Sequence, residues 1–150
     1  MKSMKATVVL LAALFTGCAS DPVDDAPGKS SGGEASRVAA SMVGKPYRYG
    51  GHSPGGFDCS GLVYFSYQRA GLSVPRSTSS QRARSRKVSL NRVASGDLLF
   101  FNQEGKYASH VGIYIGRDRF VHAPSSGKRV RVDVLTDPYW QKNLVDARRF

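Results

Sequence analysis

The sequence has few cysteines, few acidic side chains and no apolar run long enough to cross a bilayer. Its two cysteines are too few for a disulfide framework, and 150 residues can form one domain with its own core without one. The sequence has only 11 acidic residues and 22 basic ones, which gives a net charge of +11. Its apolar content of 41% excludes a largely disordered chain. There is no internal repeat. We therefore expect a basic, folded, single-domain protein in which each cysteine needs its own explanation.

The longest apolar run covers residues 6–15, broken only by Thr7, and follows Lys2 and Lys5. Ten helical residues rise about 15 Å, roughly half the thickness of the hydrocarbon layer, so the run is too short to span and is typical of an export signal. Small residues and then Cys18 follow it, which resembles the bacterial lipobox. That resemblance implies cleavage before Cys18 and lipid attachment to it; an ordinary secretory signal with an incidental cysteine is the alternative.

The chain is expected to divide into a signal with its lipobox cysteine (1–18), a flexible tether (19–33) and a folded domain (34–150). The tether is rich in Ser, Pro, Gly, Asp and Ala and lacks apolar periodicity. The domain holds 19 basic and 8 acidic residues, so the net charge belongs to it.

Ala19 is not the Asp that retains lipoproteins at the inner membrane in many Gram-negative bacteria. By that resemblance, we expect an outer-membrane anchor facing the periplasm.

Within the domain, the patterns predict helices first and an antiparallel sheet afterwards, which is the α+β order. The first predicted helix covers residues 34–43, and a glycine-rich loop follows at 47–57. The second covers 59–70, with Asp58 as its N-cap and Gly71 in the stop position. The predicted strands are residues 97–101, 110–115, 119–123 and 130–134.

Cys59 is the only thiol left once Cys18 carries lipid, and it falls on the first turn of the second predicted helix. Unpaired backbone N–H groups and the helix dipole stabilise negative charge there, so we expect a lowered thiol pKa and a nucleophilic thiolate. The same amides could bind an oxyanion. The alternative is a buried structural cysteine.

A thiol nucleophile needs a base, and the base needs an orienting partner. His110 and His122 lie on adjacent predicted strands. A three-residue loop of Gly116, Arg117 and Asp118 makes Gly112 oppose His122, which places the two histidines on one face as diagonal neighbours. We predict this odd-length loop, with Val111, Ile113 and Ile115 facing the core from the opposite face.

Two other interpretations of these residues stay open. The histidines could be polar side chains on a solvated face of the sheet. Alternatively, Cys59, His110 and His122 could bind zinc, with water or His52 as the fourth ligand, although the paired spacings of zinc sites are absent.

Six segments, in order, resemble the NlpC family of bacterial cell-wall cysteine endopeptidases, in particular its short Spr-type murein endopeptidases. The segments are YRYGG (47–51), DCSG (58–61), PRST with Gln81 (75–78), GDLLFF (96–101), HVGIYIG (110–116) and FVHA (120–123). The resemblance extends to the closing residues 139–150. It implies a papain-like α+β fold in which the helix bearing the nucleophile packs on a five- or six-stranded antiparallel sheet.

The resemblance also implies roles for individual residues. Cys59 matches the nucleophile, His110 the general base and acid, and His122 the residue that orients His110. Tyr47 matches a tyrosine that helps to hold the oxyanion. Asp58 and Ser60 match positions that line the substrate groove.

The implied reaction is hydrolysis of amide bonds in the stem or cross-bridge peptides of peptidoglycan by a monomer without cofactor or metal. The rival functions are a related amidase or acyltransferase on another envelope substrate, and a catalytically inactive wall-binding lipoprotein. The basic charge suits carboxylate-rich stems, and export disfavours nucleic acid. The basic run 82–87 is either a solvated face or a contact for an anionic polymer or lipid surface.

Overall fold

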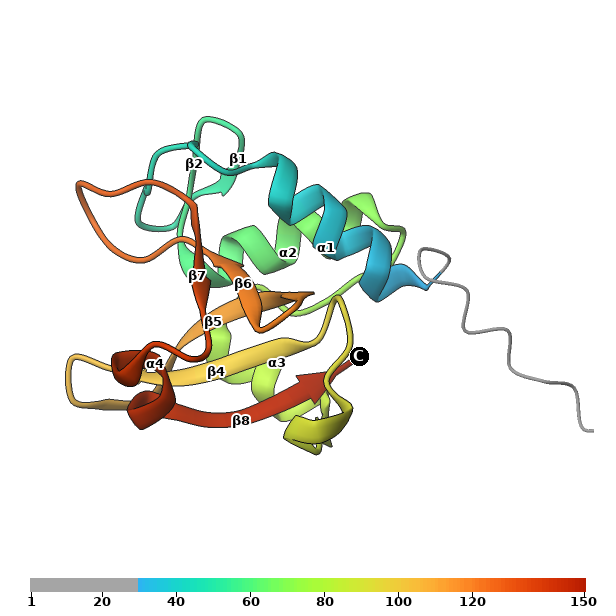
Figure 1. The fold of residues 1–150 in the computed structure, drawn as a ribbon. Helices are drawn as coiled ribbons and strands as arrows, with labels where there is room; N and C mark the ends of the chain where they lie inside the picture. The colour runs from blue at the N-terminus through green and yellow to red at the C-terminus, as the bar shows by residue number, and fades with distance from the viewer. Residues whose placement is uncertain (1–29) are drawn as a thin grey trace, which may run out of the picture.

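The computed structural model describes residues 30–150. The predicted signal, Cys18 and residues 19–29 of the predicted tether lie outside this range. Four α-helices and one 3₁₀ turn occur within it (Figure 1). They are α1 (Ser31–Ser41), α2 (Cys59–Arg69), α3 (Thr78–Arg84), the 3₁₀ turn η1 (Leu90–Arg92) and α4 (Pro138–Asn143).

The strands form a two-stranded hairpin and a six-stranded antiparallel sheet. The hairpin is β1 (His52–Ser53) with β2 (Gly56–Phe57), inside the predicted glycine-rich loop. The sheet has the order β3-β8-β4-β5-β6-β7. Its strands are β3 (Arg86–Val88), β4 (Leu98–Gln103), β5 (Lys106–Gly116), β6 (Arg119–His122), β7 (Arg131–Val134) and β8 (Leu144–Arg149). The predicted α+β class is confirmed, and the sheet has the larger of the two strand numbers that the resemblance implied.

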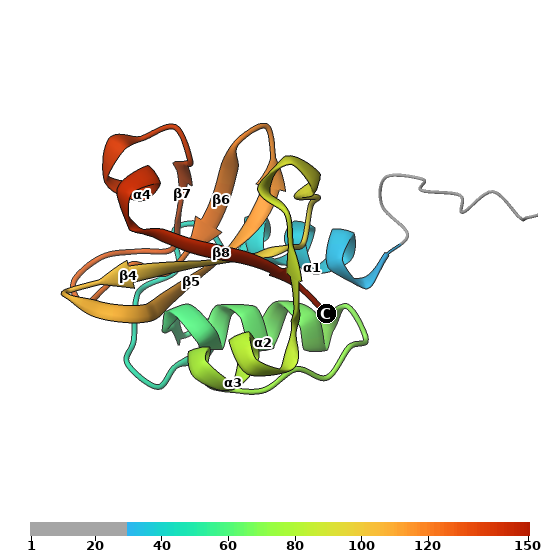
Figure 2. The same ribbon diagram turned by 90° about the horizontal axis from the view of Figure 1, so that it is seen from below.

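Helices cover both faces of this sheet. Figure 2 shows α2 and α3 on one side of it and α4 on the other, and α1 packs into the same core as α2. The strand β4 shows the consequence: Leu98 and Phe100 pack with the first group of helices, whereas Leu99 and Phe101 pack with Trp140 of α4. A strand buried on both faces reads as a continuous apolar run, here LLFF, instead of an alternating one.

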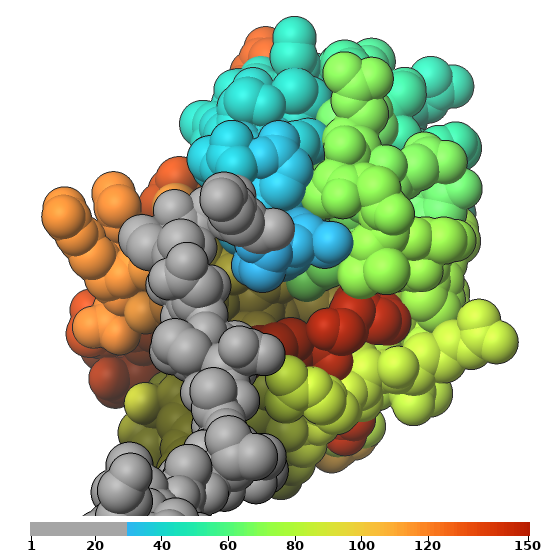
Figure 3. All heavy atoms as spheres, turned by 90° about the vertical axis from the view of Figure 1, so that its right-hand side faces the viewer, coloured from blue at the N-terminus to red at the C-terminus, as the bar shows by residue number. Residues whose placement is uncertain are grey.

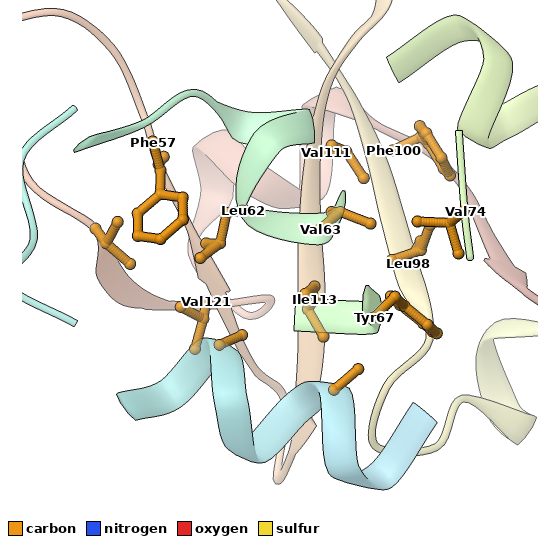
Figure 4. Packing of buried hydrophobic residues seen from close by; sticks show 14 of the residues in the cluster. Phe57, Leu62, Val63, Tyr67, Val74, Leu98, Phe100, Val111, Ile113 and Val121 are labelled. Atoms are coloured by element: carbon orange, nitrogen blue, oxygen red, sulfur yellow. The ribbon is translucent and has the colours of Figure 1, made fainter. Parts of the chain in front are cut away.

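The larger core lies between the sheet and helices α1 and α2 (Figure 4). Val111 and Ile113 of β5 face it and are fully buried, as predicted, against Leu62 and Val63 of α2. Burying each such side chain stabilises the fold by about 1.5–3 kcal/mol. This packing fixes α2, and with it Cys59, over the middle of the sheet.

Helix α1 begins at Ser31, three residues before the predicted start. Ser30 caps it by accepting a hydrogen bond from the Gly33 N–H at 3.1 Å. A Cβ at Gly96 would overlap the backbone of Gly32, so the glycine at position 96 lets the first turn of α1 approach the loop before β4. Figure 3 shows the blue surface of α1 lying against the green surface of the segment that contains α2.

The sequence patterns missed α3, α4, β3 and β8, and also the short hairpin of β1 and β2. Residues 75–87 read as a polar stretch, yet they contain α3 and most of β3. The strand β8 lies between β3 and β4 although it carries Asp146, which is 5% exposed. Arg82 at 2.7 Å and Arg148 at 3.1 Å pair with that carboxylate. Buried charge is tolerated in a strand only where such partners exist, and tertiary structure supplies them.

Candidate active site

Cys59 is the first residue of α2, as predicted. Asp58 caps the helix by accepting a hydrogen bond from the Gly61 N–H at 2.6 Å. The Cys59 side chain is half-buried, and its Sγ lies 3.6 Å from the Thr78 Oγ1 of α3. The sulfur is therefore held between two helix starts.

The expected lowering of the thiol pKa is wrong. Burial raises the pKa of the Cys59 thiol, and the Asp58 carboxylate acts in the same direction. Hydrogen bonds from Thr78 and from the backbone N–H groups of Val111 and Ser60 oppose the rise without cancelling it. Removing water around a small charge outweighs the favourable helix terminus, so the resting sulfur is a neutral thiol.

The β5–β6 hairpin has the predicted register but not the predicted loop. Ile113 pairs with Val121, the register in which Gly112 opposes His122. Gly116 pairs with Arg119, so the turn contains only Arg117 and Asp118, whose φ angles of 53° and 54° are left-handed. The extra residue that sets this register lies in a β-bulge between Tyr114 and Gly116. One extra residue in the strand has the same effect on parity as one extra residue in the loop.

This register joins the two histidines. The Nε2 of His110 and the Nδ1 of His122 are 2.8 Å apart, and the two rings are 1% and 0% exposed. His110 stacks on Trp140 with 5.8 Å between ring centroids. The alternative of histidines on a solvated face is therefore wrong, because α4 covers that face.

Both histidines are neutral near pH 7. Burial lowers the pKa of His110 to about 3, and the neighbouring His122 acts in the same direction. Burial also lowers the pKa of His122, against the opposing effect of its hydrogen bond to Asp133. The resting site thus combines a neutral thiol with neutral imidazoles.

A groove of about 570 Å³ brings most of the predicted site residues together. Cys59 and His110 both line it, and so do Tyr47, Asp58 and Ser60. His122 lies behind His110, fully buried. Burial raises the pKa of Tyr47, with smaller contributions from Cys59 and Asp58, so its phenol keeps the proton and can donate it in a hydrogen bond.

A thiol, an imidazole and hydrogen-bond donors on one groove match the chemistry expected of the six sequence segments. The family model of NlpC/P60 matches residues 44–149, which include every residue of this groove. The chain belongs to the NlpC/P60 family.

Two curated relatives of this NlpC/P60 domain illustrate the similarity. The murein DD-endopeptidase MepH of Escherichia coli K12 is 40% identical over 113 residues, which cover 72% of this chain and 42% of that protein. The gamma-D-glutamyl-L-lysine dipeptidyl-peptidase of Bacillus subtilis 168 is 38% identical over 132 residues, covering 87% and 45%. This chain thus matches less than half the length of each.

A solved structure shows the same fold. It is a lipoprotein-like NLP/P60 family protein of Staphylococcus aureus Mu50, 37% identical, with a TM-score of 0.71. The match covers 79% of this chain and 41% of that one.

The sequence reasoning missed two charged residues of the NlpC/P60 site. Arg76 lines the groove, pairs with Asp58 at 2.8 Å and donates to the Ser60 Oγ at 3.0 Å. Asp133 lies 2.9 Å from the Nε2 of His122. Asp133 was within the predicted strand 130–134, but the sequence carried no signal for the β6–β7 register that brings it to His122.

The zinc alternative does not fit this arrangement. The two nitrogens of His122 are both occupied, by His110 and by Asp133. Within residues 30–150, no three His, Cys, Asp or Glu side chains are arranged to hold a metal ion. The same range contains no helix with the length and apolar character that crossing a membrane requires.

Proposed function

We propose that this protein is a cysteine peptidase that hydrolyses amide bonds in the stem or cross-bridge peptides of peptidoglycan. The observation that carries the proposal is the groove of an NlpC/P60 domain that both Cys59 and His110 line, with His122 hydrogen-bonded behind His110. The names of the two curated relatives, a murein endopeptidase and a glutamyl-lysine peptidase, support the substrate class.

The proposed chemistry starts from the neutral pair. Nδ1 of His110 takes the thiol proton as the Cys59 Sγ attacks the substrate carbonyl carbon, which forms the C–S bond and pushes charge onto the carbonyl oxygen. Backbone N–H groups at the start of α2 and the Tyr47 hydroxyl are the donors for that oxyanion. Each such donor is typically worth about 10²- to 10³-fold in rate.

The tetrahedral intermediate then collapses. His110 gives its proton to the leaving amine, the C–N bond breaks, and a thioester to Cys59 remains. His110 next takes a proton from water, whose oxygen attacks the thioester and releases the acid and the thiol. General acid–base assistance of this kind contributes about 10²- to 10⁴-fold.

Asp58, Ser60 and Arg76 form the polar end of the groove. Asp58 accepts the bidentate Arg76 at 2.8 and 3.0 Å, and its carboxylate also accepts the Gly50 N–H at 2.9 Å. We assign Asp58 and Ser60 to substrate binding, with Arg76 holding both side chains in place. The net charge of +11 attracts carboxylate-bearing stems over the screening distance of about 8 Å.

We further propose that the mature chain begins at a lipid-bearing Cys18 and is anchored to the outer membrane, facing the periplasm. The apolar run that precedes Cys18 and the residue Ala19 after it support this assignment. The lipid bilayer is then the second partner of the protein, which acts as a monomer.

Digestion of purified peptidoglycan tests the enzymatic proposal. The wild-type protein should release soluble fragments whose new termini, identified by mass spectrometry, show which amide bond is cut; the variant Cys59→Ala should release none. Equal release by both proteins would contradict the cysteine mechanism. Binding of the polymer without release by either protein would favour the inactive wall-binding alternative, and modified rather than hydrolysed termini would favour an acyltransferase.

A further inference from the structure

A single carboxylate oxygen gathers four N–H donors beside the buried histidines. The Oδ2 of Asp133 lies 2.9 Å from the Nε2 of His122 and 3.1 Å from the indole Nε1 of Trp140. Arg131 donates to the same oxygen from its Nε at 3.0 Å and its Nη2 at 2.8 Å. Donors from β6, β7 and α4 thus converge on one acceptor that the reaction described above does not use.

The charge of this acceptor is fixed by its neighbours. Burial acts to raise the pKa of Asp133, but the hydrogen bonds from His122 and Arg131 outweigh it and hold the pKa at about 2. Lys128 and Asp137 line the small cavity on its open side, and Arg131 is half exposed. Asp133 is therefore an anion near neutral pH, and it can only accept hydrogen bonds.

An acceptor-only Asp133 determines where both imidazoles carry their protons. Neutral His122 must hold its proton on Nε2 to donate to Asp133, which leaves its Nδ1 as an acceptor. The hydrogen in the 2.8 Å contact must then come from the Nε2 of His110. The one remaining lone pair, on the Nδ1 of His110, is the site that a general base needs.

We propose that Asp133 is a positioning residue that sets the tautomers of both histidines and stabilises the imidazolium formed when the Cys59 proton arrives. The inference rests on the cysteine mechanism proposed above and extends it from three residues to a row of four, Cys59, His110, His122 and Asp133. Because Arg131 of the same strand β7 and Trp140 of α4 both hold the carboxylate, the row is anchored in the sheet and in α4 and not in a loop.

The variant Asp133→Asn separates the charge from the shape. Its amide oxygen can take the Oδ2 position and keep the four donors, so the tautomers and the fold should persist while the negative charge is lost. We expect kcat on soluble stem peptides to fall about 10- to 100-fold with KM little changed, which is part of the 10²–10⁴ of general acid–base assistance. The acid limb of the pH profile should move to lower pH, because an imidazolium without its counter-charge is less stable.

Two controls distinguish this role from a structural one. Asp118→Asn makes the same chemical change in the exposed β5–β6 turn and should leave kcat and the acid limb unchanged. Asp133→Glu restores the charge on a longer arm and should recover part of the lost kcat. A variant that merely lowered the folded fraction would reduce the rate without moving the acid limb.

Imidazole ¹⁵N spectra and thiol alkylation test the inference without any substrate. Both His110 and His122 of the wild type should give the signature of the Nε2-protonated tautomer, and Asp133→Asn should slow alkylation of Cys59 by iodoacetamide. An Nδ1-protonated His110, or wild-type kcat and acid limb in Asp133→Asn, would overturn the role of Asp133. Failure of the wild type to cut peptidoglycan would instead count against the proposed function, and the spectra would still decide the tautomers.

Discussion

Burial controls the protonation of the reacting pair, Cys59 and His110. The helix terminus favours a thiolate, but the loss of water around the sulfur raises the thiol pKa, while the imidazole pKa falls to about 3. Both shifts keep the proton on sulfur. In the proposed mechanism the pair therefore differs from a preformed thiolate–imidazolium, and proton transfer accompanies attack on the substrate.

This assignment predicts a broad pH profile. The neutral pair loses its base only when His110 is protonated, so kcat/KM of the wild type should keep its acid limb well below the ordinary imidazole value of about 6.5. Initial rates on a soluble stem peptide between pH 4 and 9, with circular dichroism at each pH to verify folding, should show no acid limb near pH 6.5. A limb centred at pH 6.5 or above would show that the base is an ordinary, solvated imidazole.

At the scale of the element, a glycine lets the start of α2 sit against the loop that carries Tyr47. A Cβ on Gly61 would overlap the carbonyl oxygen of Gly51 and lie 2.8 Å from the Asp58 Oδ1. The same Gly51 carbonyl accepts hydrogen bonds from the Asp58 N–H at 3.0 Å and from Arg76 at 3.2 Å. The glycine of the DCSG segment therefore serves packing between helix and loop.

Gly61→Ala should weaken both stability and catalysis. Alanine gains about 1 kcal/mol of helix propensity, but overpacking typically costs about 1–3 kcal/mol, so we expect a net loss of up to about 2 kcal/mol in the free energy of unfolding. The displaced loop should also lower kcat.

Ser66→Ala is the matched control on the same helix. The Ser66 Oγ is buried without a hydrogen-bond partner, so its removal should leave stability unchanged or raise it by about 1 kcal/mol, with unchanged kcat. Urea unfolding of both variants measures the difference, and a Gly61→Ala protein as stable as Ser66→Ala would show that the loop can move aside at no cost.

At the scale of the whole molecule, the two cysteines have separate tasks in the proposed function. Cys59 is half-buried in the folded domain, where it has no disulfide partner. Cys18 precedes residues 30–150 and is proposed to carry lipid. One thiol is then assigned to chemistry and the other to attachment, and each can be removed without the other.

Metabolic labelling with an alkyne-tagged palmitate should therefore mark the wild-type protein and the variant Cys59→Ser but not Cys18→Ser. The labelled proteins should sediment with the outer membrane of a Gram-negative host, and Ala19→Asp should move them toward the inner membrane. Label on Cys18→Ser, or equal labelling of all three proteins, would contradict attachment at Cys18.

Within residues 30–150, the local patterns predicted two of the four α-helices and four of the six strands of the large sheet. Asp58 and Gly71 mark the two ends of α2, because a helix cap or stop depends on the type of a single residue. These two residues placed Cys59 at a helix start. Strand alternation placed Val111 and Ile113 in the core. The alternation of side chains along the β5–β6 hairpin predicted the contact between His110 and His122. The extra residue that this register needs lies in a β-bulge and not in the loop, where it was expected.

Tertiary structure alone decided the charges and the distant partners of the site. The sequence does not encode how much water surrounds Cys59, so the direction of its pKa shift was predicted wrongly. The strand β8 and the contact between Asp133 and His122 depend on which strands become neighbours. Burial and pairing between segments far apart in the chain exist only once the whole sheet has formed, whereas caps, turns and alternation act between residues within one turn or one strand.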